Sequence, residues 1–194
     1  MSDVHEILSV IGKSERVYVP SDDTFLMIDA LNTLQLRGKQ VLDVGTGSGI
    51  LGLMCAKMGA RVTLTDIEDL TLEKVKTAAR SLNLTIEALR SDIFSNLEGK
   101  FDVVVFNPPY LPSGEIKDAA VDGGNEGRRL IDRFLTELPR HLKEDGYALL
   151  LVSSVNDPRA IMDSHPELTF TIVTSRSIFF EELLVLLCKS RNRS

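Results

Sequence analysis

The chain has 194 residues, of which 43% are hydrophobic and 26% are charged, and this balance suits one globular domain spanning residues 1–194. Its formal net charge is −6 and it has no run of five or more Lys or Arg, so its composition does not favour non-specific nucleic-acid binding. No secretory signal is visible, and the apolar runs are far shorter than the roughly 18 residues of a membrane span, so we expect a cytoplasmic protein.

Two short helices are predicted in an N-terminal entry segment, residues 1–36. Apolar residues at helical spacing between Val4 and Ile11 indicate a first helix that ends at Gly12. Ser21 is placed to cap a second helix, and the two aspartates that follow it suit the first helical turn. This second helix should run to Leu31.

Apolar strands then alternate with helical patterns as far as residue 153. The alternation is typical of a parallel sheet whose strands are joined by right-handed crossovers. The predicted strands are 41–44, 61–65, 86–89, 101–106 and 147–153. The predicted helices are 50–58, 70–82 and one from about 127 to 141.

The C-terminal pattern is different. Two strands, 168–173 and 182–187, follow one another without a helical pattern between them, which predicts an antiparallel hairpin. The complete pattern predicts an α/β fold: a seven-stranded, mostly parallel sheet with a reversed edge and helices on both faces, in a Rossmann-like arrangement.

The cysteines and histidines show no ligand pattern. Cys55 and Cys188 lie far apart in apolar segments, which favours core thiols over a redox or metal-binding pair. The three histidines are scattered without ligand spacing: His5, His141 and His165. We therefore expect no bound metal.

A proline pair follows the fourth predicted strand, in Asn107-Pro108-Pro109-Tyr110. Neither proline can donate to a sheet, so a rigid loop should leave the carboxyl end of a central strand, where open α/β sheets bind ligands. Asn107 offers a carbonyl oxygen and an NH₂, and Tyr110 offers a flat aromatic face, so together they could hold a planar amino or amide group. A plain strand-terminating turn is the alternative.

A glycine-rich loop, residues 43–49, follows the first predicted strand. Its glycines permit positive φ and a close approach of a ligand to the backbone. Gly45-x-Gly47-x-Gly49 resembles the loop of methyltransferases that use S-adenosylmethionine. Gly47-x-Gly49-x-x-Gly52 also fits the dinucleotide loop of dehydrogenases. Tight packing of a strand–helix turn would explain such a loop as well.

Three aspartates follow successive strands and should lie beside one crevice. Asp43 could face an ammonium group, which a methionine moiety has and a nicotinamide dinucleotide lacks. Asp66 could accept both hydroxyls of a ribose. Asp92 could accept from an adenine amino group while the backbone N–H of Ile93 serves a ring nitrogen. Each could be a turn or capping aspartate, but the three together favour a bound S-adenosylmethionine.

In this order the motifs resemble a class I methyltransferase. More narrowly they resemble the HemK/PrmC family, whose members methylate the glutamine of a Gly-Gly-Gln motif in translation release factors. The resemblance covers nearly the whole chain. Tyr18-x-Pro20-x-x-Asp23-Thr24 is similar to the entry segment of that family and implies that Thr24 contacts the cofactor. Two further segments are similar to a glycine cluster and a closing hairpin of the family: 122–127 and 175–183.

Only about 20 residues precede this entry segment, whereas the long bacterial forms carry a helical domain that docks the release factor. The chain therefore resembles the short branch of archaea and eukaryotes, which works with a small zinc-binding activator protein paired on the edge of the sheet. The strand Ile86–Leu89 should be that edge, open to β-augmentation. An ordinary edge strand of a monomer is the alternative.

The resemblance implies S-adenosylmethionine as the methyl donor and catalytic roles for Asn107, Pro108 and Tyr110. The Asn107 side-chain oxygen and the Pro108 carbonyl could accept hydrogen bonds from the two N–H groups of an amide, and Tyr110 could stack on the amide plane. Asn107 would also contact the cofactor. Catalysis would then be mainly orientation, and the neutralisation of the sulfonium removes the need for a strong base.

Other acceptors stay open because the tetrapeptide fits any planar NH₂. An exocyclic amine of adenine or guanine is the main alternative, and it would call for a basic surface near the crevice. The only local concentration of arginines, between Arg128 and Arg140, is explained more simply as a solvated helix face. A protein lysine, a non-catalytic binder and a nicotinamide enzyme are further alternatives.

Overall fold

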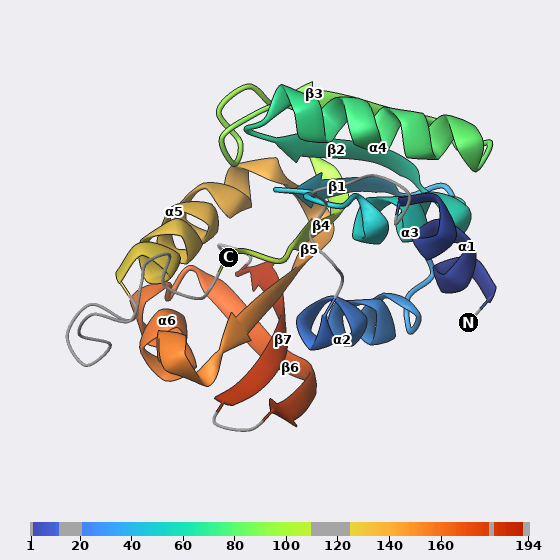
Figure 1. The fold of residues 1–194 in the computed structure, drawn as a ribbon. Helices are drawn as coiled ribbons and strands as arrows, with labels where there is room; N and C mark the ends of the chain where they lie inside the picture. The colour runs from blue at the N-terminus through green and yellow to red at the C-terminus, as the bar shows by residue number, and fades with distance from the viewer. Residues whose placement is uncertain (1, 12–20, 110–124, 179–180, 192–194) are drawn as a thin grey trace.

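The computed structural model describes residues 2–11, 21–109, 125–178 and 181–191. The strands are β1 (Gln40–Val44), β2 (Arg61–Asp66), β3 (Ile86–Arg90), β4 (Phe101–Phe106), β5 (Leu142–Ser153), β6 (Leu168–Ile178) and β7 (Glu181–Ser190). They form one seven-stranded sheet in the order β3-β2-β1-β4-β5-β7-β6 (Figure 1). The first five strands of the chain, β1 to β5, are parallel to one another, and β7 is antiparallel to both of its neighbours, β5 and β6. The predicted architecture is confirmed, and the reversed strand lies one place inside the edge.

The helices are α1 (Ser2–Ile11), α2 (Asp22–Leu31), α3 (Ile50–Lys57), α4 (Asp69–Ser81), α5 (Asn125–His141) and α6 (Pro158–Ser164), with a short 3₁₀ helix η1 (Ser154–Asn156). They cover both faces of the sheet, as predicted. Helices α1 to α4 pack on the face that carries Val103 and Val105. Helices α5 and α6 pack on the face that carries Val104 (Figure 1). Burial on both faces explains why the central strands are continuously apolar.

Several elements in the C-terminal half differ from the prediction: β6 ends five residues later than expected, β7 is longer at both ends, β5 starts earlier, and no helix was predicted over α6. Strand β5 starts five residues earlier than expected, and its pairing with β4 shifts register after Phe101. The added residues are the buried Leu142, three charged residues and Gly146, where a Cβ would lie 2.7 Å from the Phe101 carbonyl oxygen. Helix α6 begins at Pro158, and Asp157 caps it by accepting from the Ala160 N–H. Both segments resemble turns in sequence, so their pairing depends on tertiary context.

The predicted cap of α2 is only partly correct. Ser21 occupies the N-cap position, but its side chain caps no backbone N–H of the helix. Its hydroxyl donates instead to a carboxylate oxygen of Asp23. The same oxygen accepts the backbone N–H of Thr24 at 2.6 Å. The helix start is therefore organised around the Asp23 carboxylate.

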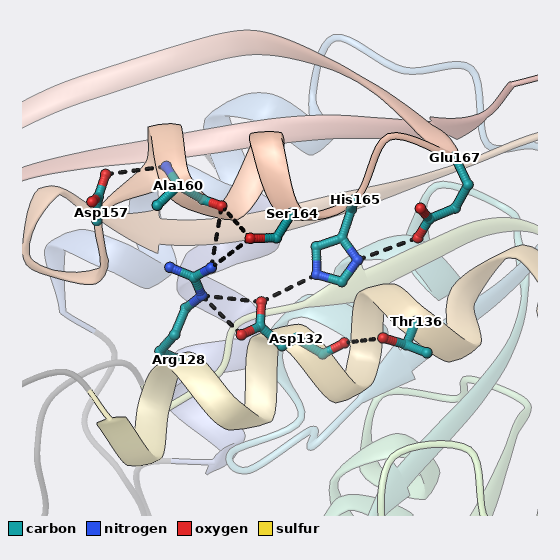
Figure 2. Close-up of polar contacts among 8 residues, drawn as sticks. All are labelled: Arg128, Asp132, Thr136, Asp157, Ala160, Ser164, His165 and Glu167. Atoms are coloured by element: carbon teal, nitrogen blue, oxygen red, sulfur yellow. Dashed lines mark hydrogen bonds and ion pairs between the residues drawn. The ribbon is translucent and has the colours of Figure 1, made fainter.

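A polar network joins α5 to α6 and to the start of β6 (Figure 2). The Arg128 guanidinium donates to both carboxylate oxygens of Asp132, at 2.9 and 3.0 Å, and to the Ala160 carbonyl at 3.2 Å. The two ring nitrogens of His165 lie 3.1 Å from Asp132 and 3.3 Å from Glu167. This network fixes α5 against the C-terminal part of the sheet.

Within the ranges that the structure describes, no helix is long and apolar enough to cross a membrane. Among the same residues, no group of three or more His, Cys, Asp or Glu side chains is placed to hold a metal ion.

Candidate active site

A cavity of about 380 Å³ opens where β1 and β4 end. Three segments that are far apart in the sequence line it: the start of α2, the glycine loop after β1, and the residues after β4. Its described lining residues are Asp23, Thr24, Asp43, Gly45, Thr46, Gly47, Ser48, Ile50, Leu51, Asn107, Pro108 and Pro109. The carboxyl edge of a parallel sheet is where this class of fold binds its ligands.

The cavity brings together six of the eleven predicted site residues: Thr24, Asp43, Gly45, Gly47, Asn107 and Pro108. Four others, Gly49, Asp66, Asp92 and Ile93, lie outside its described lining. Tyr110 lies outside the described residues.

The glycines of the loop have distinct structural roles. Gly45 and Gly47 line the cavity with φ of 59° and 52°. Gly49 is the N-cap of α3 with φ of 82°, and a Cβ there would lie 2.8 Å from a methyl carbon of Val75. A Cβ on Gly52 would lie 2.3 Å from Leu64 on β2. Close packing of α3 therefore accounts for Gly49 and Gly52, whereas Gly45 and Gly47 are the loop glycines that face the cavity.

Asp43 is a buried carboxylate at the wall of the cavity, with 2% of its surface exposed. Its Oδ2 accepts from the Thr46 hydroxyl at 2.6 Å and from the Gly52 N–H at 2.9 Å. Burial raises the pKa of this carboxyl from 3.8 to about 7, and the charge of Asp66 adds to the rise, whereas the two hydrogen bonds lower it. A cation bound in the cavity would favour the ionised form.

Asp66 ties the glycine loop to the loop after β2. One carboxylate oxygen accepts the Gly47 N–H at 3.0 Å, and the other accepts the Glu68 N–H at 3.1 Å. Each carboxylate oxygen has two acceptor sites, so both retain capacity for a further donor such as a ribose hydroxyl.

Asp92 follows the carboxyl end of β3, at the same end of the sheet's strands as the cavity. Its Oδ2 accepts from the Arg133 guanidinium of α5 at 3.0 Å, and its backbone N–H donates to the Ser95 hydroxyl at 3.1 Å. Ile93 has a positive φ of 53° and a side chain packed against the α5 side of the core. The ion pair with Arg133 leaves the other oxygen of Asp92, Oδ1, outside that contact.

The side chain of Asn107 has a partner that sequence reasoning missed. Its Nδ2 donates to Oδ2 of Asp23 at 3.1 Å, across 84 residues of sequence. Its Oδ1 is buried and has no hydrogen-bond partner among the described residues. A buried acceptor without a donor is unusual in a folded protein, so a donor from a bound molecule is expected there. The entry-segment motif contained the signal, although only its threonine was assigned a contact.

Comparison with known proteins decides the family of this fold. Residues 22–175 match the model of the methyltransferase small domain. The chain belongs to this family. The methyltransferase is 37% identical over 179 residues to a Methanocaldococcus jannaschii protein whose name gives N5-glutamine methylation of proteins as a candidate activity. That match covers 88% of this chain and 90% of the relative.

The methyltransferase also belongs to the HemK/PrmC family. It is 36% identical over 166 residues to the mouse methyltransferase HEMK2, covering 77% of this chain and 78% of that protein. A solved E. cuniculi complex, Mtq2–Trm112, is described as methylating the translation termination factor eRF1. The matched chain has a TM-score of 0.71 and 29% identity, with 90% of this chain and 99% of that chain covered. Membership of a methyltransferase family implies S-adenosylmethionine as the methyl donor.

Proposed function

We propose that this enzyme methylates the side-chain nitrogen of a protein glutamine, in the Gly-Gly-Gln motif of a translation release factor. The observation that carries the proposal is the buried Oδ1 of Asn107, an acceptor without a donor beside the glycine loop. A glutamine amide supplies such a donor. The names of the relatives support the same substrate class.

The reaction needs orientation more than acid–base chemistry. An amide nitrogen is a poor nucleophile because its lone pair is delocalised into the carbonyl. In the proposal, Oδ1 of Asn107 and the Pro108 carbonyl accept hydrogen bonds from the two N–H groups of the substrate amide. These bonds align the amide nitrogen with the reacting methyl carbon. Such alignment contributes up to roughly 7–11 kcal/mol in well-oriented systems. The cofactor supplies an activated methyl group on a positive sulfur, and the proton displaced from the nitrogen leaves to solvent.

S-Adenosylmethionine is a cation, and the cavity offers it carboxylates. Asp43, whose pKa burial raises to about 7, is the proposed partner of the cofactor ammonium. Thr24 and the backbone of Gly45 and Gly47 line the same space. In the proposal, Asp66 holds the ribose through its remaining acceptor sites, and the free oxygen of Asp92 and the backbone of Ile93 hold the adenine.

The test is mass spectrometry of a recombinant release factor after incubation with S-adenosylmethionine. We expect a gain of one methyl group on the glutamine of the Gly-Gly-Gln motif. Asn107→Ala should lose at least about 100-fold in rate, as misplacement of a reacting group does, while cofactor affinity stays within a few-fold. Full activity of Asn107→Ala would contradict the assigned role. Fragmentation spectra that place the methyl group on lysine would contradict glutamine as the methyl acceptor.

A nucleobase substrate gains little from the structure. Two of the four arginines on α5 are already neutralised, Arg128 by Asp132 and Arg133 by Asp92. This arrangement lowers the free basic charge that α5 offers to a nucleic-acid backbone and favours the interpretation of a solvated helix face. Methyl transfer to RNA or DNA, with binding that weakens steeply as salt rises, would overturn the protein-substrate proposal.

We further propose that a small activator protein, similar to Trm112, adds to the β3 edge of the sheet. β3 is the terminal strand on that side and, among the described residues, pairs with β2 alone. Two exposed apolar side chains follow the neighbouring strand β2: Ile67 and Leu70 are 61% and 68% exposed. Arg90, at the end of β3, donates to the Ile67 carbonyl at 3.1 Å.

The surface is tested by co-purification of the methyltransferase with a Trm112-like protein from the same organism. Leu70→Glu should weaken the complex at least about 10-fold, because it places a charge in an apolar contact. Ile172→Glu is the matched control, since Ile172 is 53% exposed on β6 at the opposite edge. Equal complex formation by both variants would contradict the assignment of the β3 edge.

A further inference from the structure

The side-chain NH₂ of Asn107 donates to the Asp23 carboxylate at the wall of the cavity. We infer that Asp23 is a positioning residue, which fixes the end of the Asn107 carboxamide that faces the substrate. The inference rests on the proposed function, because that function assigns the substrate contact to Oδ1 of Asn107. The two residues come from α2 and from the loop after β4, and their side chains meet at 3.1 Å.

The two ends of a carboxamide have nearly the same shape but opposite hydrogen-bonding character. The oxygen accepts and the NH₂ donates, so a half-turn of the group would exchange the two at the cavity wall. An ionised carboxylate only accepts. Asp23 can therefore pair with Nδ2 of Asn107, whereas Oδ1 in that position would face another acceptor. The carboxylate thus directs Oδ1 toward the cavity.

Asp23 is itself held on both sides. It is 4% exposed. Its Oδ1 accepts from the Thr24 N–H at 2.6 Å and from the Ser21 hydroxyl, while its Oδ2 is the oxygen that accepts from Asn107. Each carboxylate oxygen therefore has an assigned donor. The group cannot rotate without losing contacts at the start of α2.

The helix that carries Asp23 is also fixed. Arg176 on β6 reaches Asp22 at 3.3 Å and Asp29 at 3.0 Å, near the two ends of α2. The opposite side of α2 buries Leu26 and Met27 in the core. The position of Asp23 relative to the β4 loop is therefore set by the packing of α2 on the sheet.

The expected consequence is a polarity rule for the site. With Oδ1 inward, the site accepts an N–H of the substrate amide. With the carboxamide turned, an NH₂ would face the substrate NH₂, donor against donor. Loss of Asp23 should therefore reduce the rate of methyl transfer and leave the binding of cofactor and substrate protein nearly unchanged.

Four variants test the inference on the full chain with its activator where one is required: Asp23→Asn, Asn107→Asp, the double variant D23N/N107D, and the control Asp22→Asn. Asp22 precedes Asp23 on α2 and is 60% exposed. Asp23→Asn should lower kcat about 10- to 100-fold, since an amide no longer enforces the orientation. KM for the release factor and the dissociation constant of S-adenosylmethionine should stay within about three-fold.

The double variant D23N/N107D, which exchanges the carboxylate and the carboxamide, is the most discriminating test. Asn107→Asp alone places two carboxylates face to face and should lose more activity than Asp23→Asn. In D23N/N107D, the introduced amide donates to the introduced carboxylate, which again presents an acceptor to the substrate. This variant should therefore be at least about ten-fold more active than Asn107→Asp, because it restores the alignment. Asp22→Asn should retain wild-type kcat, because Arg176 keeps its contact with Asp29 and the exposed Asp22 pair adds little to the packing of α2.

A readout without substrate separates this inference from the proposed function. Nuclear magnetic resonance of the Asn107 side-chain NH₂ should show protons protected from solvent exchange in the wild type and in Asp22→Asn. Asp23→Asn should abolish that protection. Wild-type kcat in Asp23→Asn, equal protection in that variant, or no recovery in D23N/N107D would each overturn the inference. Protected protons without any glutamine methylation would overturn only the proposed function.

Discussion

The buried carboxylate of Asp43 makes cofactor binding depend on pH. In the free protein burial raises its pKa to about 7, above the ordinary 3.8. The proposed ligand group is an ammonium, which binds the ionised form. At pH 6 about one tenth of the free protein has Asp43 ionised, and at pH 7 about one half. The affinity for S-adenosylmethionine should therefore rise about five-fold between pH 6 and pH 7.

Isothermal titration calorimetry at pH 6.0, 6.5 and 7.0 measures this effect. Each pH should be run in two buffers with different ionisation enthalpies, because the difference in heat gives the protons released. We expect a net release of protons on binding that is larger at pH 6 than at pH 7, because less of Asp43 is ionised in the free protein at the lower pH. The series stops at pH 7 because the cofactor's own amino group begins to lose its proton near pH 7.7–8.0.

Asp43→Asn supplies the control. The variant should bind the cofactor at least about ten-fold more weakly at pH 7, since a charge-assisted bond is lost, and its affinity should not change between pH 6 and pH 7. A wild-type affinity that is flat with pH, with heats that do not depend on buffer, would refute the role of Asp43.

Folding favours the protonated form of Asp43, whereas cofactor binding favours the ionised form. A folded-state pKa above the unfolded value means that the folded protein binds more protons between pH 4 and pH 7. The contribution of Asp43 to stability is therefore greatest below pH 4 and is lost as the pH rises through 7. Without cofactor at pH 8, Asp43→Asn should be more stable than the wild type by on the order of 2 kcal/mol, measured by urea unfolding.

Two further predictions concern backbone and thiol chemistry. Gly49→Ala should destabilise the protein by about 2–3 kcal/mol, because it combines a positive φ with an overlap on Val75, whereas Gly38→Ala, with φ of 76° and open space, should cost only about 1 kcal/mol in the same urea titration. Equal losses would refute the packing explanation. Cys55 and Cys188 are fully buried, and burial raises the pKa of both thiols, so neither should react with a thiol reagent until urea unfolds the chain. Rapid reaction of the native protein would contradict this placement.

Local pattern was enough for most of the fold because each element carries its own periodicity. The apolar run Phe101–Phe106 indicated a strand buried on both faces, and the structure places it in the middle of the sheet. The turn-like residues before Gly146 hid the first part of β5, whose pairing depends on β4. The spacing of Gly45 and Gly47 indicated a ligand loop, and both line the cavity.

The sequence by itself determined the succession of strands and helices along the chain, the family, and the loops that face the cavity, because these depend on spacing along the chain. Only the tertiary structure decided which side chains meet. Asp23 reaches Asn107 across 84 residues, and Arg133 reaches Asp92 across 41, because the order of strands in the sheet brings their elements together. The raised pKa of Asp43 likewise results from burial, which no local pattern specifies.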